Sequence, residues 1–313
     1  MGLVVTDIEF RNYVDGDESQ ILELFRAAFE SELLLSEWRW RYLANPVDKP
    51  RILLAWAGDK LAAHYAVSPV EFYVRGARRL CALSMTTMTH PDYQGRGLFS
   101  RLASETYGRL AAEGYHFVYG FPNRHSHAGF VDRLGWRNCG YVPQLELVAD
   151  PREDAPKLHS ESQPTAFQVE LINRPPGGRW VHPVRDLRYL RWRYHEHPSM
   201  RYEYLNLMNE GNLEGCAIVK RYQGGLDVLE FAYRSSAAAS LLAAGLQRHA
   251  AEEGLHAVRL WLSLDEPAYS QLERLGMAPK SPVTFFGSRR LNGSGINGDA
   301  PQWLLRMGLS DVY

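Results

Sequence analysis

The sequence has few cysteines and no surplus of charge of either sign. Its 313 residues include three cysteines, Cys81, Cys139 and Cys216, which lie too far apart for a CxxC metal pair. Their odd number also argues against a disulfide framework, so a reducing compartment such as the cytoplasm is expected. Lys and Arg (35) nearly balance Asp and Glu (36), which leaves no overall field to favour nucleic acid or an anionic membrane.

Long apolar runs are absent as well. No stretch approaches the roughly 18 apolar residues that a membrane-spanning helix needs. The first residues, MGLVVTDIEFRNY, show no basic segment followed by a long apolar core, so no secretion signal is expected. Apolar residues make up 45% of the chain and charged residues 23%, as in ordinary globular proteins. The length fits two domains of about 150 residues each.

Short motifs recur in the same order in the two halves of the chain. The matching pairs are 39–42 and 191–194 (RWRY in both), 111–116 and 251–256 (AAEGYH and AEEGLH), and 133–136 and 274–277 (RLGW and RLGM). Such an ordered repeat predicts that one α/β unit has been duplicated. The polar, proline-containing segment 151–165 then predicts a linker between a first domain at 1–150 and a second domain at 166–313.

A turn between a predicted strand and a predicted helix gives the first indication of chemistry. Residues 81–89 are typical of a strand, and Leu98, Leu102, Thr106 and Leu110 recur every four positions, as in a helix. The turn between them contains QGRG at 94–97. Free backbone N–H groups at a helix start bind anions, and glycines let the backbone approach a phosphate closely. The turn therefore predicts either a phosphate site or a purely structural bend.

Two common phosphate loops are excluded by the residues themselves. No Gly-Lys-Ser/Thr follows the turn, so it is not a Walker A loop. The third glycine of a dinucleotide-binding turn is also missing.

The run 88–102, MTHPDYQGRGLFSRL, resembles motif A of the GNAT acyltransferase superfamily, Gln/Arg-x-x-Gly-x-Gly/Ala. Gln94 and Gly97 stand at the first and fourth places, and Phe99 stands at the sixth, where the family has Gly or Ala. The resemblance implies that the co-substrate is acetyl-CoA or another acyl-CoA. Its pyrophosphate would lie on the backbone amides of residues 95–100, with Arg96 adding a charge-assisted contact.

A second segment is similar to motif B of the same superfamily. It comprises YGFPN at 119–123, Ser126, and a helix ending in Leu-Gly-Trp at 134–136. In the family, the Asn after the strand binds pantetheine, and the strand edge before motif A pairs with it. The implied CoA-binding residues are Thr87, Met88, Thr89, Gln94, Gly95, Arg96, Gly97, Leu98, Phe99, Ser100, Asn123 and Ser126.

The resemblance also implies the fold. It predicts a mixed α/β protein with two GNAT-like domains in tandem, each with a central mixed β-sheet flanked by helices. In the second half, the segment 231–241, FAYRSSAAASL, contains no glycine. The second copy is therefore expected to be degenerate, without a cofactor site, and to shape the acceptor site, because clefts between domains favour ligand binding.

The catalytic groups are less well defined than the CoA site. The general acid of the family, a Tyr in motif B, is missing, because Val131 stands in its place. Candidates for the base that accepts the amine proton are His64, His127 and its neighbour His125. Some tandem relatives send their C-terminal tail into the active site, so Asp311 or the terminal carboxylate is a further candidate. No metal site is predicted.

The predicted activity is transfer of an acyl group, with acetyl as the first choice, from acyl-CoA to a primary amine of a small molecule. The amine attacks the thioester directly, and a nucleotide-linked amino sugar is one class of acceptor that the resemblance suggests. Neither nucleic acid nor a membrane is expected as a partner, and the oligomeric state is left open.

Two alternative functions stay open. An aminoacyl transferase of the Fem type also has two GNAT-like halves, but the phosphate loop and the lack of basic surplus argue against an aminoacyl-tRNA substrate. A CoA-binding sensor without turnover would suit the missing Tyr.

Overall fold

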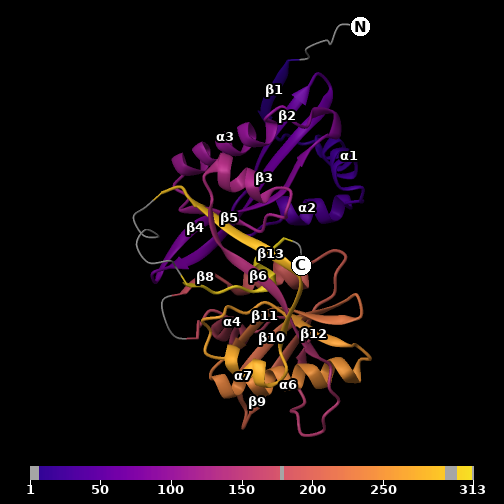
Figure 1. Cartoon of the computed structure of the whole chain (residues 1–313), viewed down its shortest axis with the longest axis vertical. Coiled ribbons are helices and arrows are strands. Elements are labelled where there is room, and N and C mark those ends of the chain that lie inside the picture. Colours follow the sequence, from indigo (N-terminus) through magenta and orange to yellow (C-terminus); the bar gives the residue numbers. More distant parts are fainter. Residues whose placement is uncertain (1–6, 177–179, 293–301, 312–313) are drawn as a thin grey trace. The chain divides into compact units, whose positions relative to one another are not determined.

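The chain folds into two α/β units (Figure 1). The computed structural model describes residues 7–176, 180–292 and 302–311. Unit 1 and unit 2 are built from segments that alternate along the chain, namely residues 1–70, 79–139 and 286–294 for unit 1, and residues 71–78, 140–285 and 295–313 for unit 2.

Among its described residues, unit 1 combines a mixed sheet with three α-helices and two shorter helical segments. Its elements are β1 (Ile8–Asn12), α1 (Glu18–Phe29), α2 (Leu35–Leu43), β2 (Arg51–Ala57), most of β3 (Lys60–Val74) and of β4 (Ala77–Thr89), η1 (Pro91–Tyr93), α3 (Leu98–Ala112), β5 (Phe117–Gly120), η2 (Gly129–Arg133) and the end of β13 (Ala278–Arg290). The strand order through this unit is β1-β2-β3-β4-β5-β13.

Unit 2 has a similar make-up. Its elements are most of β6 (Arg137–Val148), β7 (His159–Glu161), α4 (Ala166–Ile172), β8 (Trp180–Pro183), α5 (Leu187–Leu190), η3 (Arg191–His195), β9 (Glu203–Asn209), β10 (Asn212–Tyr222), β11 (Gly225–Tyr233), α6 (Ser236–Glu252), β12 (Ala257–Leu260), α7 (Tyr269–Arg274), most of β13, β14 (Gln302–Trp303) and η4 (Met307–Leu309). The strand order is β6-β12-β11-β10-β9-β7. Strand β8 pairs with β14 and with residues 72–73 of β3.

The two units repeat one order of elements, as the sequence motifs predict. In unit 1, β2 pairs antiparallel with β3, a hairpin leads to β4, and α3 connects β4 to the parallel strand β5. In unit 2, β9, β10 and β11 pair antiparallel, and α6 connects β11 to the parallel strand β12. The helices α3 and α6 are followed by Gly114 and Gly254, whose φ angles are 85° and 70°. The predicted mixed α/β fold with two repeated halves is confirmed.

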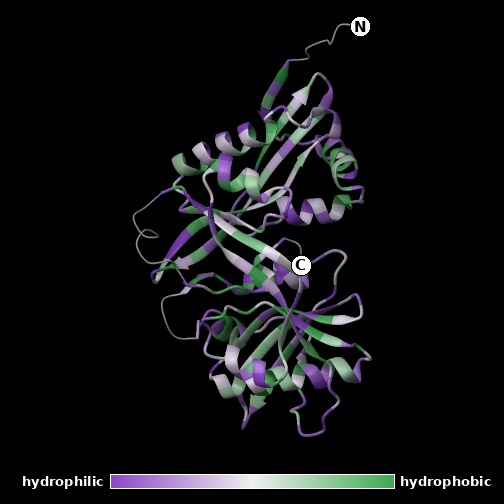
Figure 2. Ribbon diagram, viewed as in Figure 1, coloured by the Kyte–Doolittle hydropathy of each residue, from purple (hydrophilic) through white to green (hydrophobic). Residues whose placement is uncertain are grey.

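The amphipathic pattern of α3 explains its place in unit 1. Figure 2 shows hydrophilic and hydrophobic residues alternating around this helix. The apolar residues of the helix and of the sheet form one buried cluster. Its helix members are Leu98, Leu102, Ala103, Tyr107 and Leu110, and its strand members include Leu53, Val67, Ala82 and Val118.

The connection between β3 and β4 is a two-residue turn. Arg75 and Gly76 both have positive φ angles, 52° and 79°, which is the geometry of a type I′ hairpin turn. The turn of the β3–β4 hairpin therefore lies at these two residues. The segment 151–165, predicted to be a linker, contains the short strand β7, which pairs with β9.

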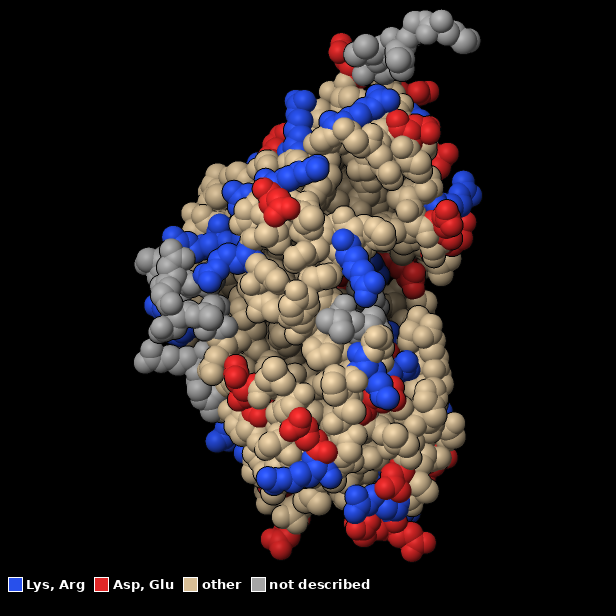
Figure 3. All heavy atoms as spheres, viewed as in Figure 1, with Lys and Arg blue, Asp and Glu red and all other residues tan. Residues whose placement is uncertain are grey.

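The surface carries both signs of charge. On the face shown in Figure 3, acidic and basic residues are both distributed over the surface. None of the helices within the described ranges combines the length and the apolar character of a membrane span. The described residues also contain no group of three or more His, Cys, Asp or Glu side chains arranged to hold a metal ion.

The backbone at Gly308 is tightly enclosed, which generates a stability prediction. A Cβ atom at Gly308 would overlap the Tyr194 hydroxyl and lie 2.7 Å from Glu230 Oε1 and 2.9 Å from the Leu229 carbonyl oxygen. We expect Gly308→Ala to lower the free energy of unfolding by about 1–3 kcal/mol, because the surrounding atoms must move. Urea denaturation followed by circular dichroism measures the change.

A matched control is available in α3. No atom lies within 4 Å of a Cβ placed at Gly108, so Gly108→Ala is expected to stabilise the helix by up to about 1 kcal/mol. An unchanged denaturation midpoint for Gly308→Ala would contradict the tight packing described above.

Candidate functional site

Strand β4 separates from β5 after a short stretch of pairing. The two parallel strands are in register at Ala82 and Leu83 of β4, whereas β4 continues to Thr89 and β5 ends at Gly120. Within the described part of the chain, residues 84–89 have no pairing with β5. These residues therefore form an edge on that side, and the predicted pantetheine-binding residues lie along it.

Thr86 departs from strand geometry on this edge. Its φ angle is 50°, a left-handed conformation that is rare for a β-branched residue and costs about 1–3 kcal/mol. The Thr86 carbonyl oxygen lies 2.9 Å from Nδ1 of His64 on β3. This hydrogen bond offsets part of the cost and fixes the orientation of the peptide.

His64 is fully buried and neutral at physiological pH. Burial lowers the pKa of His64 to about 4, and hydrogen bonding to Thr86 acts in the opposite direction. Because a carbonyl oxygen only accepts hydrogen bonds, Nδ1 carries the proton and Nε2 carries the lone pair. Among the described residues Nε2 has no hydrogen-bond partner, and the ring meets Tyr42 of α2 edge-on at 6.1 Å between centroids.

The turn after β4 presents an open helix N-terminus. Gly97 is the N-cap of α3 with a φ angle of 73°, and no side chain caps the helix. Gly95 has a φ angle of 76°, and nothing lies within 4 Å of a Cβ placed at either glycine. The Ser100 hydroxyl in the first turn is buried and has no hydrogen-bond partner among the described residues. Free amides and a free hydroxyl together suit an anionic group.

The equivalent helix of unit 2, α6, has a capped N-terminus. Only two residues connect β11 to α6, and the Ser235 hydroxyl accepts a hydrogen bond from the Ala238 amide at 3.1 Å. This side chain satisfies an amide that is left open in α3. The glycine-free segment therefore forms an ordinary capped helix.

Two basic side chains lie beside the turn. Arg96 donates to the Asp92 carbonyl oxygen at 3.2 Å, and its guanidinium lies 4.9 Å from the centre of the Tyr93 ring. Lys60 forms an ion pair with the Asp92 carboxylate at 3.1 Å. These contacts hold both cations near the start of α3, where a phosphate would meet them.

The motif B segment is organised by the side chain of Asn123. Its Oδ1 accepts hydrogen bonds from the amides of His125 and Ser126, both at 3.0 Å, and from the Ser126 hydroxyl at 3.2 Å. The His127 amide donates to the Asn123 carbonyl oxygen at 2.9 Å. The structure thus brings Asn123, Ser126 and His127 into one turn after β5. The Asn123 Nδ2 group takes no part in these bonds.

Phe99 occupies the motif place where the family has a small residue, and its side chain serves packing. It meets Phe130 edge-on at 5.1 Å and Tyr65 at 6.3 Å between ring centroids. A Cβ at Gly129 would approach Phe99 Cε1 to 3.0 Å. Glycine at 129 therefore makes room for the bulky ring, which is partly buried and packs against the core of unit 1.

A buried chain of hydroxyl groups next to β4 is not predicted by any sequence motif. The Tyr65 hydroxyl lies 2.8 Å from Ser84 Oγ and 2.7 Å from the Tyr107 hydroxyl, which accepts from Trp136 Nε1 at 3.0 Å. Burial raises the pKa of both tyrosines. The chain links β3, β4, α3 and the connection before β6, and it includes Ser84, where the pairing with β5 has just ended. No residue spacing signals it, because its members come from four separate segments of the chain.

Asp311 belongs to unit 2. The preceding segment is fixed by Arg306, whose guanidinium bonds both carboxylate oxygens of Glu266 at 2.6 and 2.8 Å. The Ser310 carbonyl oxygen accepts from Arg193 at 3.2 Å. Asp311 is partly buried after this anchor, and its catalytic role stays a prediction. The terminal carboxylate lies outside the described residues.

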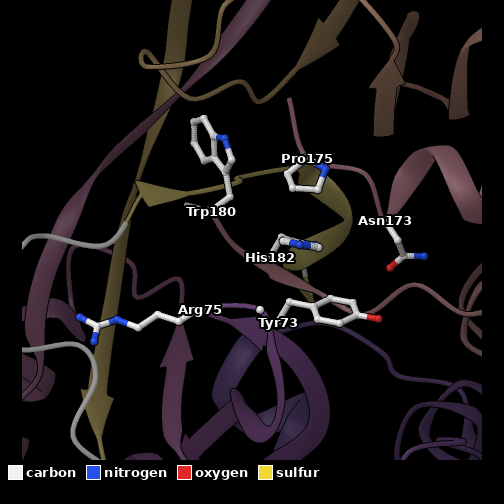
Figure 4. A pocket seen from close by; sticks show the side chains of 7 residues that line it. Tyr73, Arg75, Asn173, Pro175, Trp180 and His182 are labelled. Carbon is white, nitrogen blue, oxygen red and sulfur yellow. The ribbon is translucent and has the colours of Figure 1, made fainter. Parts of the chain in front are cut away.

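A separate cavity lies in unit 2 (Figure 4). Its volume is about 600 Å³, and its lining residues are Tyr73, Arg75, Gly76, Asn173, Pro175, Trp180 and His182. Tyr73 and His182 point to the same side, with their ring centroids 5.1 Å apart, whereas Arg75 points away from them. None of the predicted site residues is among these lining residues.

The buried neutral state of His64 generates a pH prediction. In the unfolded chain its pKa is near the ordinary value of about 6.5, whereas in the folded protein it is about 4. The neutral ring therefore costs the folded protein nothing above pH 6.5, and the free energy of unfolding decreases as the pH falls toward 4. At pH 5 the loss is about 2 kcal/mol. We expect His64→Asn to lose less stability than the wild type between pH 8 and pH 5, by about that amount.

Urea denaturation of both proteins at the two pH values measures this difference. His182, whose pKa burial also lowers to about 4, is present in both proteins and cancels. An equal loss of stability in the two proteins would contradict the buried neutral state of His64.

The first part of the chain matches a known family. Residues 9–139 match the model of the Acetyltransferase (GNAT) domain. This range contains the β4 edge, the turn at 94–97, the start of α3 and the Asn123 segment. Among curated proteins, none matches the sequence.

Several solved structures resemble the whole chain. A protein of Enterococcus faecalis described as a probable N-acyltransferase is 14% identical, with a TM-score of 0.70 over 91% of this chain and 73% of that one. A GCN5-related N-acetyltransferase from Kribbella flavida is 18% identical, with a TM-score of 0.66 over 93% and 72%. A tandem GNAT protein from the clavulanic acid biosynthesis pathway is 14% identical, with a TM-score of 0.60 over 92% and 100%.

At such low identity the structural likeness concerns the fold, and it extends over both units. The family match covers the residues that build the open helix N-terminus and the separated strand edge. Residues 9–139 therefore match a GNAT acetyltransferase domain, and the chain as a whole has the fold of GNAT acetyltransferases, among them a tandem GNAT protein.

Proposed function

We propose that the protein transfers an acyl group, acetyl in the first instance, from acyl-CoA to a primary amine of a small molecule. The observation that carries the proposal is the uncapped N-terminus of α3 directly after a strand whose β5 side is open. An anion site and a free strand edge are the two features that a pyrophosphate joined to an amide-containing arm needs.

The residues fit the parts of CoA. The amides of residues 95–100 and the Ser100 hydroxyl would hold the pyrophosphate, with Arg96 beside them. Backbone groups of residues 87–89 would pair with the pantetheine amides, as in an added strand. The unused Nδ2 of Asn123 is a donor for a pantetheine carbonyl oxygen.

The protein's own chemistry is then positioning and proton removal. An amine and a thioester held in reach react without a covalent enzyme intermediate. The base that takes the amine proton is proposed among His127, His64 and Asp311. His127 has the support of its place beside Asn123, and His64 has the support of being neutral with an Nε2 lone pair. Val131 occupies the place of the family's acid, so the thiolate would leave unassisted or with another donor.

The second half completes the proposal. We infer a catalytic domain at 1–150, a linker at 151–165, and a second domain at 166–313 that shapes the acceptor site. The capped start of α6 supports a single CoA site in the chain. A nucleotide-linked amino sugar is the acceptor class proposed, and the cytoplasm is the proposed location, since the described cysteines are free thiols.

CoA binding is tested by a substitution at the helix start. Gly97→Ala places a methyl group where the pyrophosphate would approach, and we expect the Kd for acetyl-CoA, measured by calorimetry, to rise about tenfold or more. Gly76→Ala is the matched control, because Gly76 has a similar φ angle of 79° and equally open surroundings but lies at the β3–β4 turn. Equal affinity in the two variants would contradict the assigned site.

Turnover is tested by thiol release. With acetyl-CoA and a panel of amines that includes dTDP- and UDP-linked amino sugars, we expect DTNB to detect free CoA with at least one amine, and mass spectrometry to show the acetylated amine. Among His127→Gln and Asp311→Asn, the substitution at the true base would lower kcat by about 10²–10⁴. Tight CoA binding without release for any amine would instead indicate a CoA sensor.

A further inference from the structure

We propose that His64 acts as a positioning residue. Its Nδ1–H holds the Thr86 carbonyl and so directs the Thr87 amide N–H toward the carbonyl oxygen of the bound acyl thioester. This role rests on the acyl-CoA site proposed above, and it differs from the role of a base.

The direction of the Thr87 amide follows from the peptide plane. The C=O of Thr86 and the N–H of Thr87 belong to one trans peptide group, so they point in opposite directions. The C=O points toward β3, because His64 of β3 is its partner at 2.9 Å. The Thr87 N–H therefore points away from β3. That is the side of β4 from which β5 has separated.

The strain at Thr86 shows that this orientation is held in place. A β-branched residue at a φ angle of 50° is unfavourable by itself. Regular extended backbone would turn the Thr86–Thr87 peptide to a different direction. The hydrogen bond from a buried imidazole favours the strained arrangement, and such strain is typical of sites that must present a backbone group in one direction.

The position of His64 is itself fixed. The side chain is 0% exposed, and the ring packs against Tyr42 of α2 on one side while Nδ1 binds Thr86 on the other. No acidic side chain is a hydrogen-bond or ion-pair partner of this ring among the described residues. The ring is therefore a neutral donor in a dry environment, where a hydrogen bond is strong.

The proposed donor acts on the charge that the reaction creates. As the amine nitrogen adds to the thioester carbonyl carbon, the π electrons of C=O move onto the oxygen. They return to the carbon when the C–S bond breaks and the thiolate leaves. One proton passes from the amine nitrogen to the base, and the thiolate later takes a proton from solvent. A preformed N–H aimed at the oxygen stabilises the charged state without reorganisation.

Two substitutions at one position separate positioning from base catalysis. In His64→Asn the amide Nδ2 lies near the place of the histidine Nδ1 and can still donate to Thr86, but the lone pair of Nε2 is lost. In His64→Leu both are lost. His116→Leu is the matched control, since His116 is another buried histidine of unit 1 and its ring contacts Phe117 at the start of β5.

If His64 positions the peptide, kcat falls about 10- to 100-fold in His64→Leu with little change in KM for the amine. It stays within about threefold of wild type in His64→Asn and in His116→Leu. Loss of kcat to the same extent in His64→Asn and His64→Leu would overturn the positioning role. Unchanged kcat in His64→Leu would overturn it as well.

Two measurements do not depend on turnover. Calorimetry of His64→Leu is expected to show weaker binding of acetyl-CoA, by about threefold or more, with unchanged binding of CoA, which lacks the thioester carbonyl. ¹⁵N NMR of the wild type at pH 7 is expected to show His64 protonated at Nδ1 alone, and protonation at Nε2 instead would overturn the proposal. If the wild type itself binds no acetyl-CoA, the proposed function fails, whereas selective failure of the variants concerns His64.

Discussion

The site depends on one constraint in the backbone, because β4 must leave β5 while it stays bound to β3. A strand that is paired on both sides has no backbone N–H and C=O groups left to pair with a ligand. Here the parallel pairing ends at Leu83, and the hydroxyl chain from Ser84 through Tyr65 to Tyr107 holds β4 against its neighbours at that point. Beyond Ser84, Thr86 has a strained φ angle, and the hydrogen bond to His64 offsets part of the strain. The free edge, the open turn and the start of α3 follow in order along the chain.

The two units differ at the N-terminus of the helix that connects their parallel strands. Both units place a helix between two parallel strands. In unit 1 the connection from β4 to α3 is long. The N-cap of α3 is Gly97, which has no side chain that could accept a hydrogen bond from the helix amides. In unit 2 the connection is two residues, and Ser235 satisfies an amide itself. The difference lies in capping and not in topology, because a side chain caps the start of α6 and none caps the start of α3.

In unit 2, buried charged side chains hold the C-terminal segment in place. Arg306 forms an ion pair with Glu266. Glu230 forms an ion pair with Arg185 and accepts a hydrogen bond from the Tyr194 hydroxyl. Buried pairs of this kind add little net stability, since desolvation cancels much of the attraction, but removing one partner is costly. They therefore specify one arrangement of the segment that ends at Asp311. The close fit of Gly308 against Tyr194 and Glu230 has the same effect.

The sequence by itself determined the repeat, the strand–turn–helix order and the glycine turn at 94–97, because periodicity and turn chemistry are local properties. It also showed that the glycine turn is missing from the second half, and it predicted Asn123 as a binding residue, which stays a prediction. Only the tertiary structure decided that His64 meets Thr86, that Phe99 packs against Gly129, and that Tyr65, Tyr107 and Trp136 share one chain of hydrogen bonds. These contacts join residues that are far apart in the chain, and their geometry depends on how strands and helices pack. No spacing along the sequence records such packing.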